Sequence, residues 1–172
     1  ISNNSASYNG GGIYISSDPT LTNVTITGNS AYDGGGMNLR WSSPNLEYVT
    51  ITNNSASDDG GGILSGNSSS NPNIVNTIVS DNTGNYGIYV DSGNPSITYS
   101  NIYNNQNGNF YNIGNYVGVN VTTNANGDSC DAYINIQENP YFVNSNSGDY
   151  HLSDYSPCIG AGTATNAHEP IP

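Results

Sequence analysis

Short runs of alternating apolar and polar residues recur along the whole chain. Apolar residues two positions apart mark these runs, for example Val24 with Ile26 and Val49 with Ile51. This period is typical of strands that bury one face, and the runs are too short for helices. Pro, Gly, Asn and Asp separate the runs, as expected of turns. The pattern therefore predicts many short strands.

The runs belong to a longer repeat. Four segments align with one another and each opens on a proline: residues 19–29, 44–54, 72–82 and 95–105. A glycine-rich element follows each unit or precedes the next, at residues 10–13, 34–37, 60–63 and 87–88. Self-similarity at a period of about 25 residues indicates a solenoid. About three short strands per period predict an all-β parallel β-helix of about four to five coils, with rungs about 4.8 Å apart.

The alignment places residues of one kind in vertical files. Three apolar files predict a narrow core: Ile1, Ile26, Ile51, Val79 and Ile102; Leu21, Leu46, Ile74 and Ile97; Ile13, Met37, Ile63 and Ile88. One asparagine per period also takes a constant place: Asn4, Asn29, Asn54, Asn82 and Asn105. Because stacked amides can bond to the amides above and below, these residues predict an asparagine ladder at a turn.

The repeat divides the chain into three parts. Residues 1–106 are predicted to form the coils. Residues 107–138 lose the period and are rich in Asn, and residues 116–121 within them predict an edge strand. Residues 139–172 read as an irregular C-terminal cap with a short strand near residues 150–152. A cap would cover strand edges that a parallel stack otherwise leaves unpaired.

Two motifs resemble those of a known group. The pattern NxTITGNSAxxGGGI covers residues 1 to about 106, and residues 139–143, 148–152 and 156–162 form a second signature. Both are similar to secreted right-handed parallel β-helix repeat proteins of the polymorphic outer-membrane type and of bacterial or archaeal surfaces. The resemblance implies a right-handed β-helix with a closing segment, located outside the cell or at its surface. It implies no particular activity, since the group is functionally mixed.

Charge excludes several classes of partner. The chain has 13 acidic residues against one Lys or Arg, which gives a formal net charge of −12. No basic patch for nucleic acid or for an anionic membrane surface can be built from Arg40 alone. No apolar run approaches the roughly 20 residues of a membrane span, so membrane insertion is not expected. Cys130 and Cys158 predict a disulfide in the capping region, with two unpaired thiols as the alternative.

Acidic residues suggest one candidate site. Asp33 and Asp59 precede triple glycines on successive coils, and Asp58 adjoins them. Carboxylates stacked in this way could bind Ca²⁺ or act in hydrolysis, although Asp before Gly is also ordinary turn chemistry. A looser calcium candidate comprises Asp128, Asp131 and Glu138. No cofactor is required by the pattern, and without a convincing catalytic constellation we expect no enzyme.

Other side chains suggest weaker hypotheses. Trp41 with outward Tyr14 and Tyr89 could form a platform for stacking sugars, although scattered aromatics often only cover backbone. Paired threonines at residues 25–27 and 50–52 could bind ice but span only two coils. The histidines lack partners in sequence. Five sequons would permit glycosylation: Asn3, Asn23, Asn53, Asn67 and Asn120.

The sequence favours a structural function. Ile1 falls in the middle of a repeat, so the first coil is incomplete and its edge is open: either the chain is a piece of a longer solenoid, or another subunit fills that edge. We expect a building block of a surface appendage, filament or adhesin, which joins copies of itself or other surface-protein subunits. The predicted interface comprises Ile1, Asn4, Ala6, Gly10, Gly11, Gly12, Ile13 and Ile15, with residues 107–124 as the partner surface. The rival is a module that binds or processes carbohydrate.

Overall fold

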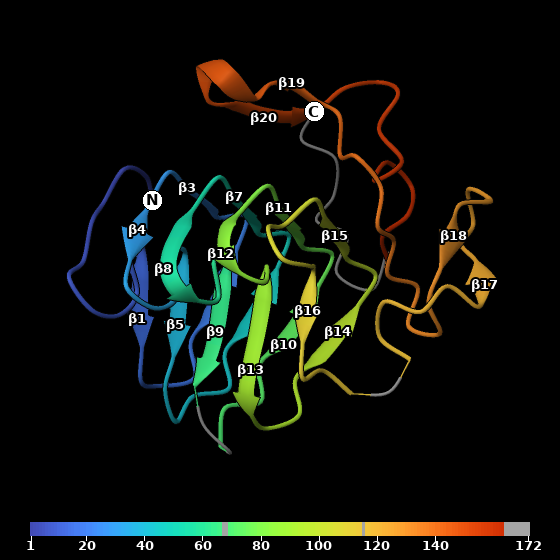
Figure 1. The fold of residues 1–172 in the computed structure, drawn as a ribbon. Coiled ribbons are helices and arrows are strands. Elements are labelled where there is room, and N and C mark those ends of the chain that lie inside the picture. Colours follow the sequence, from blue (N-terminus) through green and yellow to red (C-terminus); the bar gives the residue numbers. More distant parts are fainter. Residues whose placement is uncertain (67–68, 115, 164–172) are drawn as a thin grey trace.

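The computed structural model describes residues 1–66, 69–114 and 116–163, whose regular structure is almost entirely β-strand. Figure 1 shows the strands of the N-terminal two thirds stacked as successive turns of a solenoid. In the described residues, the strands of these turns form four parallel sheets. The predicted parallel β-helix is therefore confirmed, with about four turns.

We number the sheets I to IV in the order in which the chain meets them. Sheet I contains β1 (Ile13–Ile15), β5 (Met37–Leu39), β9 (Ile63–Gly66), β13 (Ile88–Ser92) and β16 (Phe110–Tyr111). Sheet II contains β2 (Thr20–Thr22), β6 (Asn45–Glu47), β10 (Asn73–Val75) and β14 (Ser96–Thr98). Sheet III contains β3 (Thr25–Thr27), β7 (Thr50–Thr52), β11 (Ile78–Ser80) and β15 (Asn101–Tyr103). Sheet IV contains β4 (Ser30–Ala31), β8 (Ser55–Asp59) and β12 (Thr83–Asn85).

The register between rungs stacks equivalent residues directly. Ile26 pairs with Ile51, which pairs with Val79, which pairs with Ile102. The other two apolar files pair in the same way from β2 to β14 and from β1 to β13. These side chains form one narrow buried cluster along the axis. The three predicted core files are confirmed except at Ile1, which is half exposed and lies outside this cluster.

The triple glycines let neighbouring rungs approach closely. A Cβ atom built on Gly36 would lie 2.5 Å from the carbonyl oxygen of Gly62 and 2.9 Å from Cγ2 of Ile51. No side chain fits between these atoms. Gly34 at the start of the same element has a φ of +63°, which other residues adopt at a cost. The glycines are therefore required by both backbone shape and space.

A buried ladder of asparagines runs beside the core. Oδ1 of Asn54 accepts hydrogen bonds from the main-chain nitrogen of Asn29 at 3.0 Å and from its Nδ2 at 2.9 Å. The same pair of bonds joins Asn54 to Asn82 and Asn82 to Asn105. Asn4 bonds to Asn29 in the same way at the exposed N-terminal end. Each amide therefore bonds to the next rung.

The C-terminal end of the ladder is closed by residues outside the repeat. Asn105 donates to Oδ1 of Asn109, and Nδ2 of Asn109 donates to Oε1 of Gln137 at 2.9 Å. Close by, Ile136 bridges to Asn101 of β15. The stack thus extends beyond residue 106, where the sequence predicts its end, because β16 also joins sheet I.

The region after the coils differs from the expectation in one place. Residues 116–121 form turns and irregular chain, so the predicted edge strand is wrong there. Tyr116 and Gly118 both have a φ of 75°, which an extended strand cannot accommodate. The strand pair in this region is antiparallel and lies further on, at β17 (Thr122–Thr123) and β18 (Ser129–Cys130).

The C-terminal cap includes a hairpin that lies against the solenoid. β19 (Phe142–Asn144), the short 3₁₀ helix η1 (Ser145–Ser147) and β20 (Asp149–Leu152) form it, and Figure 1 shows it above the edge formed by β3 and β7. The Tyr150 hydroxyl lies 2.7 Å from Oγ1 of Thr27. The threonine face considered for ice is therefore partly covered, and Thr52 is fully buried.

The predicted disulfide is absent, because Cys130 and Cys158 are both free thiols. Cys130 is buried with Ile136, and Cys158 packs against the same small cluster. Nδ2 of Asn101 donates to Sγ of Cys158 at 3.1 Å. Packing and this hydrogen bond, rather than a covalent bond, hold the cap here.

Replacement of Asn54 by Ala tests the ladder. The change leaves buried donors and acceptors of two neighbouring rungs without partners, so we expect the free energy of unfolding to fall by about 3 kcal/mol. Asn73→Ala, on the outside of the solenoid, is the control, since among the described residues the Asn73 side chain makes one long bond, to Asn45 at 3.3 Å. It should cost less than about 0.5 kcal/mol. Equal losses in urea denaturation would show that the ladder is not a major source of stability.

Candidate functional site

A groove of about 230 Å³ crosses the outer face of sheet I. The register places Tyr14, Asn38, Leu64, Tyr89 and Tyr111 at the same outward position on successive strands. Asn38 and Leu64 form the floor and are only 4% and 7% exposed, while Tyr89 lines one end. Strand alternation explains the placement, because their neighbours along each strand point into the core.

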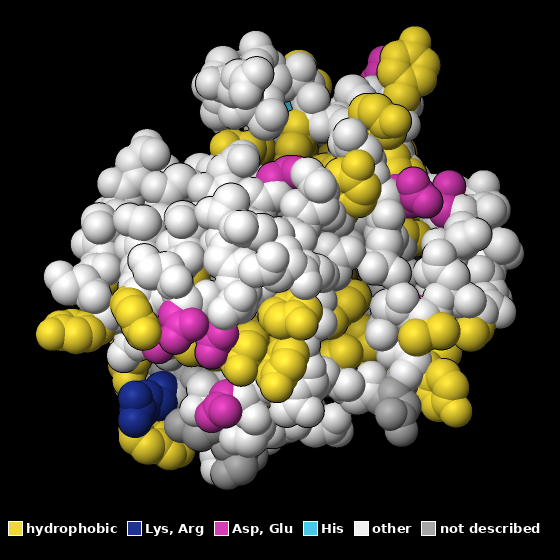
Figure 2. Space-filling model, viewed as in Figure 1, with side chains coloured by type: hydrophobic (Ala, Val, Ile, Leu, Met, Phe, Trp, Pro, Cys, Tyr) yellow, Lys and Arg dark blue, Asp and Glu magenta, His cyan; other side chains and the backbone are white. Residues whose placement is uncertain are grey.

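Charged side chains form the two rims. Asp33 and Asp59 precede the glycine turns on successive rungs and line one rim. Arg40 and Asp91 lie toward the other ends of β5 and β13 and line the opposite rim. We call this site the acidic groove; its remaining lining residues are Asn9 and Gly66. Figure 2 shows acidic and hydrophobic side chains gathered together on the face that carries β5, β9 and β13.

The two acids on one rim repel each other. Burial raises the pKa of Asp33 above its usual value, and the negative charges of Asp58 and Asp59 raise it further, although a hydrogen bond from the main chain of Asp59 acts in the opposite direction. That bond reaches Oδ1 of Asp33 at 3.4 Å. Nδ2 of Asn85 donates to Asp59 at 3.2 Å. The rim is therefore a file of carboxylates and amides under electrostatic strain.

The predicted calcium ligands are only partly brought together. Asp33 and Asp59 line the acidic groove, but Asp58 does not, and its hydrogen bonding raises the pKa of Tyr32 instead. Within the described residues, no three His, Cys, Asp or Glu side chains form a group that could hold a metal ion. Calcium binding therefore stays a prediction.

In the looser calcium candidate of Asp128, Asp131 and Glu138, Asp131 already has hydrogen-bond partners within the protein. Asp131 is fully buried and accepts hydrogen bonds from the main-chain nitrogens of Gly118, Tyr133 and Asn135 and from Nδ2 of Asn135, at 2.8 to 3.0 Å. These donors occupy the carboxylate. Asp131 thus fixes the loop that covers the last coil.

Aromatic side chains extend the groove toward the cap. The rings of Tyr89 and Tyr111 are stacked, with centroids 4.4 Å apart and an interplanar angle of 15°, and Tyr86 lies 5.2 Å from Tyr111. Burial, together with the charge of Asp59, raises the pKa of Tyr89 to about 12, so this hydroxyl stays protonated at neutral pH. Sequence reasoning missed Tyr111, because β16 lies outside the recognisable repeat, and it missed Tyr86, which stands just before β13 in the shortened glycine element.

The predicted sugar platform is divided. Tyr14 lies three rungs from Tyr89, about 14 Å along the sheet. Trp41 is exposed, and the guanidinium carbon of Arg40 lies 4.6 Å from the centre of its ring. Of the three predicted residues, only Tyr89 lines the acidic groove.

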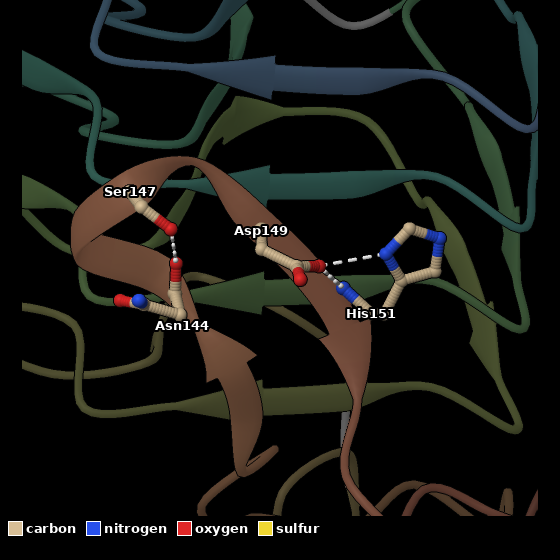
Figure 3. A network of polar contacts seen from close by, with 4 residues as sticks. All are labelled: Asn144, Ser147, Asp149 and His151. Atoms are coloured by element: carbon tan, nitrogen blue, oxygen red, sulfur yellow. Dashed lines mark hydrogen bonds and ion pairs between the residues drawn. The ribbon is translucent and has the colours of Figure 1, made fainter.

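A larger cleft of about 830 Å³ lies between the C-terminal hairpin and the first rungs. His151, which had no partner in the sequence pattern, lies 2.6 Å from Asp149 there, and its hydrogen bonds lower the pKa of Asp149. Figure 3 shows that Ser147 points to Asn144 and not to His151, so these residues do not form a Ser–His–Asp relay. His168 lies outside the described residues.

The predicted assembly residues all lie on the first rung. Ile1 is half exposed and Asn4 and Ala6 follow it, whereas Ile15 is buried in the core and offers only its main chain. Gly11 and Gly12 donate to carbonyls of the second rung, as does Ile13. Of the sequon asparagines, Asn67 lies outside the described residues, and the others are exposed at positions 3, 23, 53 and 120.

The rungs, register and capped end define a parallel β-helix protein with polar groups on its outer faces. The family model for the right-handed β-helix region matches residues 1–150, and the chain belongs to this family. No curated protein matches the chain, and no solved structure matches it. In residues 1–66, 69–114 and 116–163, no helix is long and apolar enough to cross a membrane.

Replacement of Asp33 by Asn tests the strain in the rim. Folding raises the pKa of Asp33 above 3.8, so the folded protein holds this proton more tightly than the unfolded chain, and stability falls as the pH rises through that range. Asn9 and Asn85 occupy the same file and show that an amide fits. We expect Asp33→Asn to raise the melting temperature at pH 7, with a gain that disappears below about pH 4.

Asp154→Asn serves as the control, since Asp154 is exposed in the cap. Melting curves from pH 3 to 8 measure both variants. If Asp33→Asn melts at a lower temperature than the wild type at pH 7, the Asp33 carboxylate does not destabilise the folded protein.

Proposed function

We propose that this β-helix is a carbohydrate-binding module that holds a glycan chain along the outer face of sheet I. The observation that carries the proposal is the acidic groove, where hydrogen-bonding groups and an aromatic ring surround an apolar floor at Leu64. Sugar rings present both hydroxyl groups and apolar C–H faces. Carboxylates and amides accept bonds from the hydroxyls, while aromatic rings stack on the C–H faces.

The shape of sheet I also favours a chain-like ligand. The outward file from Tyr14 to Tyr111 spans five strands, or about 19 Å. Tyrosines stand at both ends of this file, and Asn38, Leu64 and Tyr89 lie between them. Several sugar rings in succession could follow this line without any change in the main chain.

The proposal is one of binding and places the protein outside the cell or on its surface, where glycans are available. The expectation that the chain is not an enzyme stays a prediction.

Tyr89→Ala tests glycan binding. We expect wild-type protein to bind members of a panel of neutral and charged oligosaccharides, and the variant to lose about tenfold in affinity, or roughly 1.4 kcal/mol, because the stacking surface is removed. Isothermal titration calorimetry measures the affinities of ligands selected on a glycan array.

Tyr155→Ala is the matched control, since Tyr155 is 89% exposed in the cap. It should bind as the wild type does. Absence of binding across the whole panel would overturn the proposed function.

A second candidate function is assembly through the first rung, as a unit of a surface filament or adhesin. The observation that favours it is a difference between the two ends of the ladder. Oδ1 of Asn4 accepts no hydrogen bond from the described residues, whereas Asn105 is covered by Asn109. The main-chain bonds to Thr27 use Ile1 and Asn3, so the main-chain groups of Ser2 point away from β3, where the carbonyl oxygen accepts a bond from Nδ2 of Asn4 at 3.1 Å.

Ser2→Pro tests this candidate. Proline removes an edge donor that the rung itself does not use, so it should block edge pairing while the fold persists. If the rung mediates assembly, wild-type protein should sediment as larger species at rising concentration and the variant as a monomer. A wild-type protein that stays monomeric at all concentrations would remove this candidate.

A further inference from the structure

The C-terminal hairpin roofs two clefts that adjoin each other. The cleft of about 830 Å³ over the first rungs extends as far as Asn53. A second cleft, of about 450 Å³, continues from Asn53 to Tyr103 and Asn104 at the end of β15. Asn53 and Ser145 line both clefts, and Figure 3 shows the hairpin crossing the strands of the solenoid behind it. We call the two clefts together the hairpin channel.

The floor of the hairpin channel is a single file of turn residues, which we call the turn file. One residue of each rung stands directly after sheet III: Asn3, Gly28, Asn53, Asp81 and Asn104. All five have a φ between 51° and 65°, and the side chains of Asn3, Asn53 and Asn104 are exposed. Because neighbouring rungs lie about 4.8 Å apart, the turn file presents polar side chains at regular intervals over about 19 Å, with one gap at Gly28.

The roof is fastened to the solenoid at one point. The Tyr150 hydroxyl lies 2.7 Å from Oγ1 of Thr27 and accepts a hydrogen bond from Nδ2 of Asn53 at 3.4 Å. Within the described part of the chain, no other group of residues 142–152 forms a hydrogen bond with the solenoid. The Phe142 ring meets the Tyr150 ring edge-on, with centroids 5.3 Å apart. The hairpin therefore spans the channel as a strap, with Tyr150 lining one cleft and Phe142 the other.

The lining is polar, and its charged side chains already have partners. Asp149 and His151 lie 2.6 Å apart, and Oδ1 of Asp81 accepts a hydrogen bond from Nδ2 of Asn104 at 2.7 Å. Three lining side chains form no hydrogen bond with the described residues: Asn3, Thr25 and Asn146. The net charge of −12 repels anions. The hairpin channel thus suits a neutral ligand with many hydrogen-bonding groups.

The main chain of the floor favours a sugar chain over a peptide. The main-chain nitrogens of Gly28, Asn53 and Asp81 already donate to carbonyl oxygens of the next rung. An extended peptide binds chiefly through main-chain groups at a free strand edge, and the turn file offers side chains instead. Sugar hydroxyls need only such side chains.

We propose that the hairpin channel is a second carbohydrate site, separate from the acidic groove, and that it holds a neutral oligosaccharide in extended form. The hydroxyls exchange hydrogen bonds with the turn file from rung to rung. The apolar C–H faces of the sugar rings lie against Tyr150 and Phe142. With a site on each of two faces, one molecule holds two glycan chains and links them.

Hydrogen–deuterium exchange of the hairpin tests the site. The probes are the β-1,4-linked tetramers of glucose, mannose and xylose, an α-1,4-linked tetramer of galacturonic acid, and an octapeptide of alternating Gly and Ser, all at pH 7. We expect at least one neutral tetramer, at ten times its Kd, to slow exchange of the main-chain amides of residues 145–151 about tenfold. The galacturonic acid tetramer and the peptide should not slow it.

Variants assign the protection to the floor. Asn3→Gly combined with Asn53→Gly removes two amides and should remove most of the protection, while Gly28 shows that the file accepts glycine. Asn23→Gly is the matched control and should change nothing. Asn23 is exposed with a φ of 55°, but it stands in the turn between sheets II and III, outside the channel lining. Circular dichroism confirms each fold.

Tyr150→Phe gives an independent measurement on the roof. The variant keeps the ring and removes the hydroxyl that fastens the strap, so the bound tetramer should dissociate about fivefold faster in surface plasmon resonance. An unchanged dissociation rate would show that the hairpin does not act as a strap on the ligand.

The variant Tyr89→Ala separates this site from the acidic groove. Equal protection of residues 145–151 in wild-type protein and Tyr89→Ala supports the hairpin channel, and if calorimetry finds no change of affinity in this variant, the acidic groove is overturned. Binding that is lost in Tyr89→Ala, with no protection of the hairpin, overturns the hairpin channel and supports the groove. Equal protection by galacturonic acid or peptide overturns the choice of a neutral sugar. No protection by any probe overturns the hairpin channel.

Discussion

The structure depends on the pairing of each rung's main chain with the rungs above and below it. A column this thin buries few apolar side chains per rung, so hydrogen bonds between rungs must be complete. The asparagine ladder meets this need at the turn between sheets III and IV. There Asn54 satisfies the main chain of Asn29, as well as the carbonyl oxygen of Ile26 at 3.0 Å. An asparagine is required at that place in every coil. It therefore recurs at a fixed spacing, and the repeat can be recognised in the sequence.

Those parts of the fold in which one side chain recurs per rung could be predicted from the sequence. The apolar files and the positions from Asn4 to Asn105 follow from alignment alone. Sheet IV could not be predicted, because segments such as Ser55–Asp59 carry no apolar alternation and are held through main-chain pairing. The cap could not be predicted either. Its contacts, such as that of Cys158 with Asn101, join residues that no period relates.

The acidic groove could be predicted only in part from the sequence, for a related reason. Asp33 and Asp59 repeat from coil to coil, so their stacking could be predicted. Asn38 and Asp91 belong to different coils and do not repeat, and only the observed register brings them to one groove. A binding site on a solenoid is assembled from deviations from the repeat. The repeat itself predicts the scaffold and not the site.

The carboxylates at 33 and 59 recur on two successive coils, but the turn that they occupy does not require a charged residue. Asn9 and Asn85 occupy the same file, where an amide can serve the same turn. Each carboxylate adds repulsion to the rim, and burial raises the pKa of Asp33 against ionisation. Residues that reduce stability where a neutral residue would fit are characteristic of functional sites. The strain in this rim is therefore better explained by the ligand that we propose for the groove than by the fold.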